Sequence, residues 1–295
     1  MTAQGKHGPP ARPADPTVRP TAGTARRDTA PQQLPATVMG RSLRAFVIGH
    51  PRSGTMFVSE LLCAGEDSVC GHEVLVKLEL SFIELATGYY EGRRGHDEVM
   101  QDLSRYGAAP EAIDSNWKLV WVLPCLLEAF PQAKIVHLVR DPRRNVRSCI
   151  ELDYYGQLVD DARLEVHESA RVWFRAMPAI RRDDWPGMDI VERNCAFWNE
   201  THRLAEEGLE EWPAVKRIRL EDLSDEGHAR SLLQFLGVEE PARAPLLEAL
   251  NKRANLQEAE KAAVAALRPW SWSDEDEARV WGLCGPRARA YGYET

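Results

Sequence analysis

The stretch AFVIGHPRSGTMFVSELL, residues Ala45 to Leu62, decides the fold of this chain. It begins with an apolar run typical of a buried strand, passes through a tight turn rich in Gly, Pro and Ser, and continues with the apolar spacing of a helix. A strand that enters a helix through such a turn points several backbone N–H groups, and the positive end of the helix dipole, at one anion. We therefore predict a phosphate-binding loop here.

The spacing of Gly49 and Gly54 equals that of the Walker loop, but Thr55 stands where that loop requires a lysine. The cation lies inside the turn instead, as Arg52. A Walker lysine followed by Ser or Thr serves Mg²⁺ and the terminal phosphates of a nucleoside triphosphate. An arginine presents a planar fork of donors to a phosphate or a sulfate. The alternative interpretation is an ordinary turn between a strand and a helix.

A second strand followed by a helix carries another set of basic residues. In AKIVHLVRDPRRNVRSCIEL, residues 133–152, an apolar strand ends near Arg140 and a helix begins near Pro142, where the missing proline N–H costs nothing. Ser148 lies two helical turns further on, so that Arg140 and Ser148 would converge on one phosphate. Three more arginines add positive charge, with a solvated helix face as the alternative for each: Arg143, Arg144 and Arg147.

Strand and helix patterns alternate along most of the chain. Residues 114–130 are mostly helix-like, residues 169–182 and 193–209 have helical apolar spacing, VKRIR at 215–219 predicts a strand, and the helix after residue 226 ends at Gly237. This alternation favours an α/β fold with a central parallel sheet flanked by helices, a three-layer sandwich like that of P-loop NTPases. Since no repeat or linker follows residue 40, we expect one domain over residues 41–295.

Residues 1–40 have a different composition, with seven prolines, many Ala, Thr and Gly, and almost no large apolar side chains. Such a segment cannot bury enough apolar surface to offset the entropy lost on ordering, so we predict a disordered tail. The tail lacks the apolar core of a secretory signal, and no later window approaches the roughly 18 uncharged apolar residues of a membrane span. We expect a cytoplasmic protein with no membrane span.

The 295-residue chain has a formal net charge of −8, which argues against nucleic acid as a partner because that binding relies on a basic face. Local arginine clusters can still bind small anions. The six cysteines show no CxxC pair and no Cys/His cluster at metal-ligand spacing. This pattern favours free thiols and no metal site.

Together, GHPRSGT after one strand and RDPRxxVxS after another resemble the sulfotransferases that use 3′-phosphoadenosine 5′-phosphosulfate (PAPS). LEDL at residues 220–223 and the closing segment WSDEDEARVWGLCGPRARAYGY are also similar to that family, so the resemblance covers about residue 44 to the end. This chain departs from the family at Met56, because the family usually has a second Thr or Ser at this position, which donates to the 5′ phosphate. The resemblance implies two sets of donor-binding residues: Arg52, Ser53, Gly54 and Thr55 for the 5′-phosphosulfate, and Arg140 and Ser148 for the 3′ phosphate.

The resemblance also implies a general base, and SVCGHEV at residues 68–74 offers two candidates, Glu73 and His72. In protein-tyrosine sulfotransferases a glutamate follows the loop arginine in a CGEE context, and Glu73 follows Arg52 by 21 positions in a similar arrangement. We therefore predict Glu73 as the base, with His72 as the alternative. Neighbours on an extended segment point to opposite sides, so only one should face the sulfuryl group. In the structural interpretation, Glu73 merely pairs with Arg52 or Lys77.

Two further basic residues enter through the same resemblance. Lys118, in SNWKL, is similar to a lysine found near the donor or the acceptor, and Arg253, next to Lys252 in NKRAN, would close over the 3′ phosphate.

The expected reaction is transfer of a sulfuryl group from PAPS to a hydroxyl of a small-molecule or carbohydrate acceptor, a lipid or a natural product, without a metal. The enzymatic alternative is a P-loop kinase or nucleotide phosphotransferase, which would need Mg²⁺ and a nucleoside triphosphate. The other alternative is a catalytically inactive nucleotide-binding protein. The sequence leaves the acceptor and the oligomeric state open, and the aromatic residues that would line an acceptor site are Tyr89, Tyr90, Tyr154, Tyr155 and Trp173.

Overall fold

The computed structural model describes residues 44–63, 70–74, 95–107, 113–155, 187–238, 246, 248, 258–267 and 271–294. All of them lie in one unit, Val38–Thr295. The predicted disordered tail at residues 1–40 and the predicted helix at residues 169–182 lie outside the described residues.

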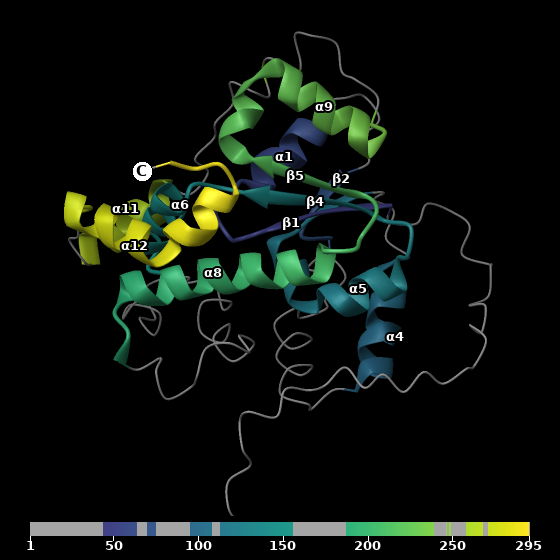
Figure 1. The fold of residues 1–295 in the computed structure, drawn as a ribbon, viewed down its shortest axis with the longest axis horizontal. Coiled ribbons are helices and arrows are strands. Elements are labelled where there is room, and N and C mark those ends of the chain that lie inside the picture. Colours follow the sequence, from purple (N-terminus) through teal and green to yellow (C-terminus); the bar gives the residue numbers. More distant parts are fainter. Residues whose placement is uncertain are drawn as a thin grey trace, which may run out of the picture. The chain divides into compact units, whose positions relative to one another are not determined.

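Five parallel strands form one sheet in the order β2-β3-β1-β4-β5. The strands are β1 (Ala45–Gly49), β2 (Cys70–His72), β3 (Ile113–Ser115), β4 (Lys134–Val139) and β5 (Val215–Arg219). Because all five run in the same direction, their carboxyl ends meet at one edge, on the left in Figure 1. The chain leaves β1 toward one side of the sheet and β4 toward the other. In open α/β sheets this switch point is where ligands bind.

Helices cover both faces of the sheet. On one face lie α1 (Thr55–Leu62) and α9 (Glu226–Leu236), above the sheet in Figure 1. The other face carries η1 (Trp117–Val122), α5 (Leu123–Ala129), α6 (Pro142–Ile150) and α8 (Ile190–Leu209). The remaining helical segments are α4 (His96–Tyr106), η5 (Leu220–Ser224), α11 (Glu258–Leu267) and α12 (Asp274–Ala290). The predicted three-layer α/β fold with a central parallel sheet is confirmed.

The side chains of β1 show how the two layers are built. Phe46 and Ile48 pack into the cluster with η1, α5 and α8, whereas Ala45 and Val47 pack against α1 and α9. This alternation is the period of a strand that is buried on both faces, and it explains why β1 reads as an unbroken apolar run.

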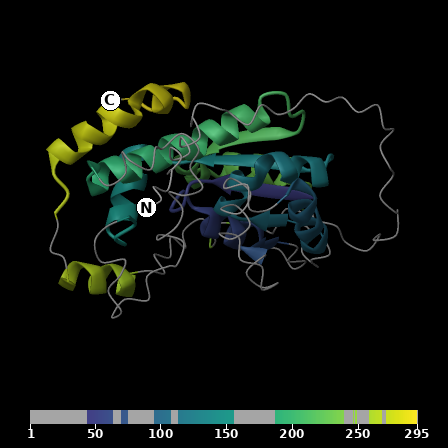
Figure 2. The same cartoon turned by 90° about the horizontal axis from the view of Figure 1, so that it is seen from below.

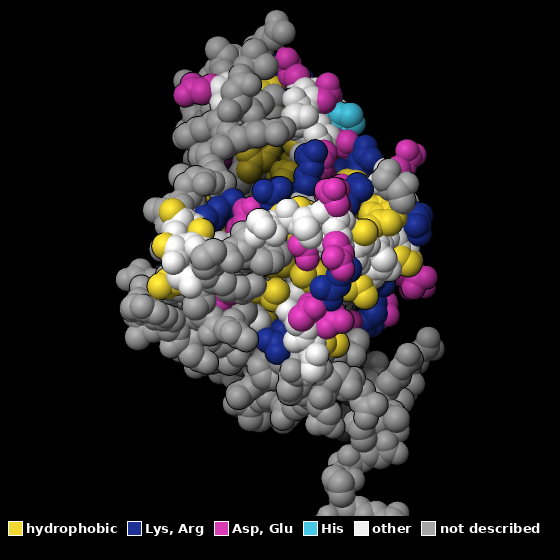
Figure 3. All heavy atoms as spheres, turned by 90° about the vertical axis from the view of Figure 1, so that its left-hand side faces the viewer, with side chains coloured by type: hydrophobic (Ala, Val, Ile, Leu, Met, Phe, Trp, Pro, Cys, Tyr) yellow, Lys and Arg dark blue, Asp and Glu magenta, His cyan; other side chains and the backbone are white. Residues whose placement is uncertain are grey.

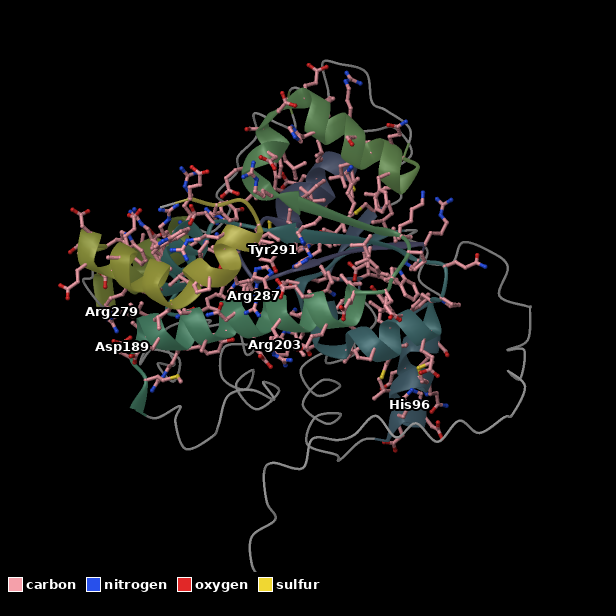
Figure 4. The ribbon with its side chains drawn as sticks, in the orientation of Figure 1. His96, Asp189, Arg203, Arg279, Arg287 and Tyr291 are labelled. Carbon is pink, nitrogen blue, oxygen red and sulfur yellow. The ribbon has the colours of Figure 1, made fainter. Side chains whose placement is uncertain are left out.

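The C-terminal helix α12 lies alongside α8 and α6, where it adds a third apolar cluster. In Figure 2 it runs along the same side as α8. Ion pairs also join α12 to α8: Arg279 bonds Asp189 at 2.5 Å, and Arg287 bonds Glu206 at 3.1 Å (Figure 4). Among the described helices, none is long and apolar enough to cross a membrane.

Helix boundaries follow the sequence closely in two cases. α9 ends at Gly237, which adopts a left-handed φ of 72° as predicted. α8 begins at Ile190, three residues before the predicted start, because Asp189 and Glu192 form a capping box there.

The prediction of a mostly helical segment at residues 114–130 was wrong at its start. Ile113 to Ser115 form β3, which pairs with both β1 and β2. Two of its three residues are polar, so the strand has no apolar run by which it could be recognised. The 3₁₀ segment η1 and helix α5 then complete the segment.

Candidate functional site

The turn between β1 and α1 has the sharp backbone of an anion-binding loop. Arg52 has a φ of 64° and Gly54 a φ of 98°, both in the left-handed region. The N–H of Ser53 donates to the carbonyl of His50 at 3.0 Å and closes the turn. Left-handed backbone is uncommon for a residue with a Cβ, and such strain persists where surrounding structure holds it.

Close packing explains the two glycines of this loop. A Cβ on Gly49 would lie 2.5 Å from the carbonyl oxygen of Leu138 on β4, and one on Gly54 would lie 2.4 Å from the Leu220 side chain. The loop therefore sits tightly between the next strand and η5. Because Gly54 is also the N-cap residue of α1 and offers no capping side chain, the first turn of α1 keeps its N–H groups available.

Ser53 supplies an unused polar group in the same turn. Its side chain is fully buried, and within the described part of the chain its hydroxyl has no hydrogen-bond partner. A buried hydroxyl normally finds a partner, since leaving it unpaired costs free energy. The unpaired hydroxyl of Ser53 is therefore consistent with a ligand at this loop that supplies a hydrogen-bond acceptor.

The second basic motif meets the first loop directly. Arg52 donates from Nε to the Ser148 hydroxyl at 3.1 Å, and Arg140 donates from Nη1 to the carbonyl of Arg52 at 2.7 Å. Asn145 adds a bond from Nδ2 to the carbonyl of Pro51 at 3.1 Å. Arg52, Arg140 and Ser148 are thus brought together at the switch point between β1 and β4.

Arg140 is partly buried where β4 ends. Burial lowers the pKa of Arg140 from its ordinary value, and the neighbouring carboxylate of Glu221 opposes that shift. A guanidinium remains charged in proteins. Figure 3 views the edge where the strands end and shows Lys and Arg side chains gathered around a recess with an apolar floor.

Two of the three extra arginines on α6 pair with acidic side chains of their own helix region. Arg143 bonds Asp141 at 2.7 Å, which raises the pKa of Arg143, and Arg147 bonds Glu151 at 3.0 Å. These pairs support the structural interpretation for both residues. Arg144 is exposed.

Glu73 follows β2 and holds two hydrogen bonds from η1. The indole N–H of Trp117 donates to Oε1 at 3.0 Å, and the ammonium group of Lys118 donates to Oε2 in a short ion pair. The Glu73 side chain is 21% exposed and that of Lys118 is 11% exposed. The structure thus places Lys118 beside the predicted base. Lys118 was not one of the two partners predicted for Glu73 in the structural interpretation, which were Arg52 and Lys77. Lys77 lies outside the described residues.

The expectation that His72 and Glu73 point to opposite sides was wrong. Glu73 leaves the extended conformation with a φ of 51°, and Nε2 of His72 lies 4.0 Å from Oε1 of Glu73. The two side chains are therefore neighbours. Nδ1 of His72 lies 2.7 Å from the carbonyl of Ser115, an acceptor, so we assign the ring proton to Nδ1 and a free lone pair to Nε2.

The remaining predicted residues fall into three groups. Thr55 opens α1 and is buried, as its place in the loop requires. Arg253, Tyr89, Tyr90 and Trp173 lie outside the described residues. Tyr154 and Tyr155, considered as walls of an acceptor site, are buried in the core with Phe197.

Sequence reasoning missed Trp117 and Asn145. Both lie inside motifs that it used, Trp117 next to Lys118 and Asn145 between Arg140 and Ser148. Their side chains bond Glu73 and Pro51, respectively. Position within a motif was the available signal, but the partner of each side chain depends on contacts across the sheet. Within the described ranges, no group of three His, Cys, Asp or Glu side chains is arranged to hold a metal ion.

Residues 104–242 match the model of the sulfotransferase family. This region contains Lys118, Arg140 and Ser148 and begins after the Arg52 loop and Glu73. The resemblance to sulfotransferases predicted from the two motifs is confirmed. No curated protein sequence matches the chain.

Several solved structures have a similar chain path. The sulfotransferase domain of the Synechococcus PCC 7002 olefin synthase has 17% identity and a TM-score of 0.46, covering 87% of this chain and 96% of that domain. The sulfotransferase domain from the curacin biosynthetic pathway has 16% identity and a TM-score of 0.42, covering 83% and 98%. A Mycobacterium avium sulfotransferase has 11% identity and a TM-score of 0.45, covering 86% and 78%.

Proposed function

We propose that this chain, whose residues 104–242 match the sulfotransferase family, transfers the sulfuryl group of PAPS to the hydroxyl of a small acceptor. One observation carries the proposal. Arg52, Arg140 and Ser148 meet where the loops after β1 and β4 diverge, a place where α/β sheets bind nucleotides.

The residues of the first loop suit the phosphosulfate end of the donor. The buried Ser53 hydroxyl, the backbone N–H groups at the start of α1 and the guanidinium of Arg52 are all hydrogen-bond donors. Such preorganised donors stabilise negative charge that develops on the transferred group and on the leaving phosphate. In this proposal Thr55 and the backbone of Gly54 complete the loop, which offsets the donor lost at Met56.

The residues of the second motif suit the 3′ phosphate. Arg140 is held by the carbonyl of Arg52, and Ser148 is held by the guanidinium of Arg52. Their positions are thus fixed before the donor binds, which lowers the entropy lost on binding. When bound, PAPS supplies the sulfuryl group and leaves as adenosine 3′,5′-bisphosphate.

Glu73 is the proposed general base. Its carboxylate would accept the proton of the acceptor hydroxyl as the oxygen attacks sulfur, while Trp117 and Lys118 hold the carboxylate in one orientation. The ion pair with Lys118 also fits the alternative in which Glu73 is only a structural counter-ion. His72 is the second candidate, because its Nε2 lone pair lies on the same side as the Glu73 carboxylate.

The experiment that tests the function uses the full chain, PAPS labelled in the sulfuryl group, and a panel of phenols, sugars and aliphatic alcohols. We expect a labelled product with at least one acceptor class, and thermal stabilisation by adenosine 3′,5′-bisphosphate. Phosphate transfer from ATP with Mg²⁺ would show the kinase alternative instead. Stabilisation without transfer to any acceptor would favour the inactive binding protein.

A further inference from the structure

We propose that Asp114 and Asn116 are positioning residues that hold the Glu73 carboxylate and its two donors in register without touching the reacting groups. The proposal rests on the proposed function for its kinetic part, because Glu73 is the base only in that reaction. Its structural part concerns a closed set of hydrogen bonds around the end of β3.

The Asp114 carboxylate is completely buried and accepts three hydrogen bonds. Oδ1 accepts from the N–H of Val74 at 3.2 Å, and Oδ2 accepts from the Tyr106 hydroxyl at 2.6 Å and from Nδ2 of Asn116 at 3.1 Å. The three donors come from the residue after Glu73, from α4 and from the start of η1. A buried carboxylate is costly unless it is well bonded, so this one is tied to three separate segments.

Asn116 carries the connection onward to the donors of Glu73. Its Oδ1 accepts from the N–H of Lys118 at 3.0 Å and caps η1, while its own N–H donates to the carbonyl of Val47 at 2.8 Å. η1 is therefore anchored to the central strand at the point where Trp117 and Lys118 leave it. Both of these side chains then bond the Glu73 carboxylate.

The backbone of Glu73 is also held, by hydrogen bonds to β3. The carbonyl of Ser115 accepts from the N–H of Glu73 at 3.4 Å, and Asp114 holds the next N–H, that of Val74. These bonds flank a residue with a φ of 51°, a conformation that a glutamate seldom adopts. Strained backbone of this kind persists when neighbouring contacts over-determine it.

The set of hydrogen bonds is closed, because Asp114 bonds both the peptide after Glu73 and Asn116, the residue that caps η1. Burial raises the pKa of Asp114 from 3.8 to about 6, and the bonds from Tyr106, Val74 and Asn116 oppose that shift. An apolar side chain would fill the same space on β3 without the cost of burying a carboxylate. What the carboxylate contributes is one bond to the peptide after Glu73 and one to Asn116, which caps the segment that carries the two donors of Glu73.

The test compares Asp114→Asn with Glu200→Gln in the full chain. Asp114→Asn keeps the size of the side chain but turns one acceptor into a donor that faces other donors. Glu200 is a matched control, because it is also a buried carboxylate and pairs with Arg203 on α8, away from β3. Two quantities are measured: the ¹H–¹⁵N resonance of the Trp117 indole without ligand, assigned with Trp117→Phe, and the kinetics of sulfuryl transfer.

We expect Asp114→Asn to shift the Trp117 indole resonance and to lower kcat at least tenfold, with the KM for PAPS changed less than twofold. We expect Tyr106→Phe, which keeps the carboxylate, to give a smaller change in both quantities. Glu200→Gln should leave both as in the wild type. A folded Asp114→Asn protein that matches Glu200→Gln in resonance and in kcat would overturn the proposal.

Failure of the proposed function gives a different result. If the wild type transfers no sulfuryl group, the kinetic part fails with it, but the indole resonance still shows whether Asp114 and Asn116 orient the donors of Glu73. If Asp114→Asn does not fold, Asn116→Ala decides the question, because it removes both side-chain bonds of Asn116 and leaves Asp114 in place. An unchanged indole resonance and an unchanged kcat in Asn116→Ala would then overturn the proposal.

Discussion

At the scale of single residues, the site consists of two groups with different chemistry. Arg52, Arg140 and Ser148 present donors for anions, while Glu73 presents a carboxylate that Lys118 and Trp117 hold in place. In the proposed function, the first group would bind the charged donor and the second would move a proton. Substitutions in the two groups should therefore change different kinetic constants.

The carboxylate of Glu73 gives the first prediction. We expect Glu73→Gln to lower the rate of sulfuryl transfer by about 10²–10⁴, the usual range for a general base, because the amide cannot accept a proton. Binding of adenosine 3′,5′-bisphosphate, measured by calorimetry, should stay within about threefold. The matched variant is His72→Asn. A larger loss in His72→Asn than in Glu73→Gln would assign the base to His72.

The guanidinium of Arg52 gives the second prediction. Arg52→Lys keeps the charge but loses the planar fork and the Nε bond to Ser148, so we expect a loss in kcat/KM of more than tenfold, or about 1.4 kcal/mol. Arg147→Lys on the exposed side of α6 is the control and should be nearly neutral. Activity of Arg52→Lys within a factor of two of the wild type would argue against a role for the fork.

At the scale of elements, the loop between β1 and α1 depends on the backbone of Gly54. Alanine at a φ of 98° is strained, so we expect Gly54→Ala to lower the free energy of unfolding by about 1–3 kcal/mol. Gly282 on α12 is a control, because a Cβ there meets open space and a helical Gly→Ala change gains about 1 kcal/mol. Urea unfolding of both variants measures the difference.

The Leu220 side chain separates strain from contact in this prediction. Leu220→Ala removes the contact at 2.4 Å from the Cβ of Gly54→Ala but leaves the left-handed backbone unchanged. We expect Gly54→Ala to lower the free energy of unfolding by nearly the same amount in the Leu220→Ala background as in the wild type. If Gly54→Ala had no cost in the Leu220→Ala background, packing against η5, and not the backbone, would make glycine necessary.

Elements built from local patterns could be predicted, and those built from distant contacts could not. The apolar runs of β1 and β4, and the proline that opens α6, lie within a few residues of the motifs they support. β3 has only one apolar residue in three and becomes a strand through pairing with β1 and β2. The turn at Glu73 likewise depends on Ser115 and Asp114, about 40 residues away.

At the scale of the whole molecule, three buried histidines, one of them in the turn that carries Arg52, lie near one another. Nε2 of His137 lies 2.9 Å from Nδ1 of His202, and the rings of His50 and His202 have centroids 6.4 Å apart. Burial lowers the pKa of His50 and His137 from 6.5 to about 3 and lowers the pKa of His202 well below its ordinary value. All three are therefore neutral in the folded protein at neutral pH.

These histidines make stability depend on pH. Below about pH 6.5 the unfolded chain binds protons that the folded chain does not, so the stability present above pH 6.5 is lost as the pH falls toward 3. Asp114 has the opposite sign, because its raised pKa costs stability as the pH rises through 6. Three histidines against one carboxyl leave a net difference of about two protons between the unfolded and the folded chain. We therefore expect the free energy of unfolding to fall by about 3 kcal/mol per unit between pH 6 and 5.

Urea unfolding at pH 7, 6 and 5 measures this slope. His137→Asn should flatten it by about 1.4 kcal/mol per pH unit, the value for one proton. Equal slopes in the wild type and His137→Asn would contradict the account. This burial was not predictable from the sequence, since each histidine is isolated in a different segment.

The contacts of the Arg52 loop with Arg140 and α6 also determine at which stage of protein synthesis the site can first form. The bonds from Arg140 to the carbonyl of Arg52 and from Asn145 to the carbonyl of Pro51 join residues 88 and 94 positions apart. A nascent chain on the ribosome therefore makes the sequence of the Arg52 loop long before it makes the residues that shape the loop. Because closing so long a loop is slow, the proposed nucleotide would have no complete site to bind during the early steps of folding. The proposed nucleotide would stabilise the chain only after α6 has emerged and docked.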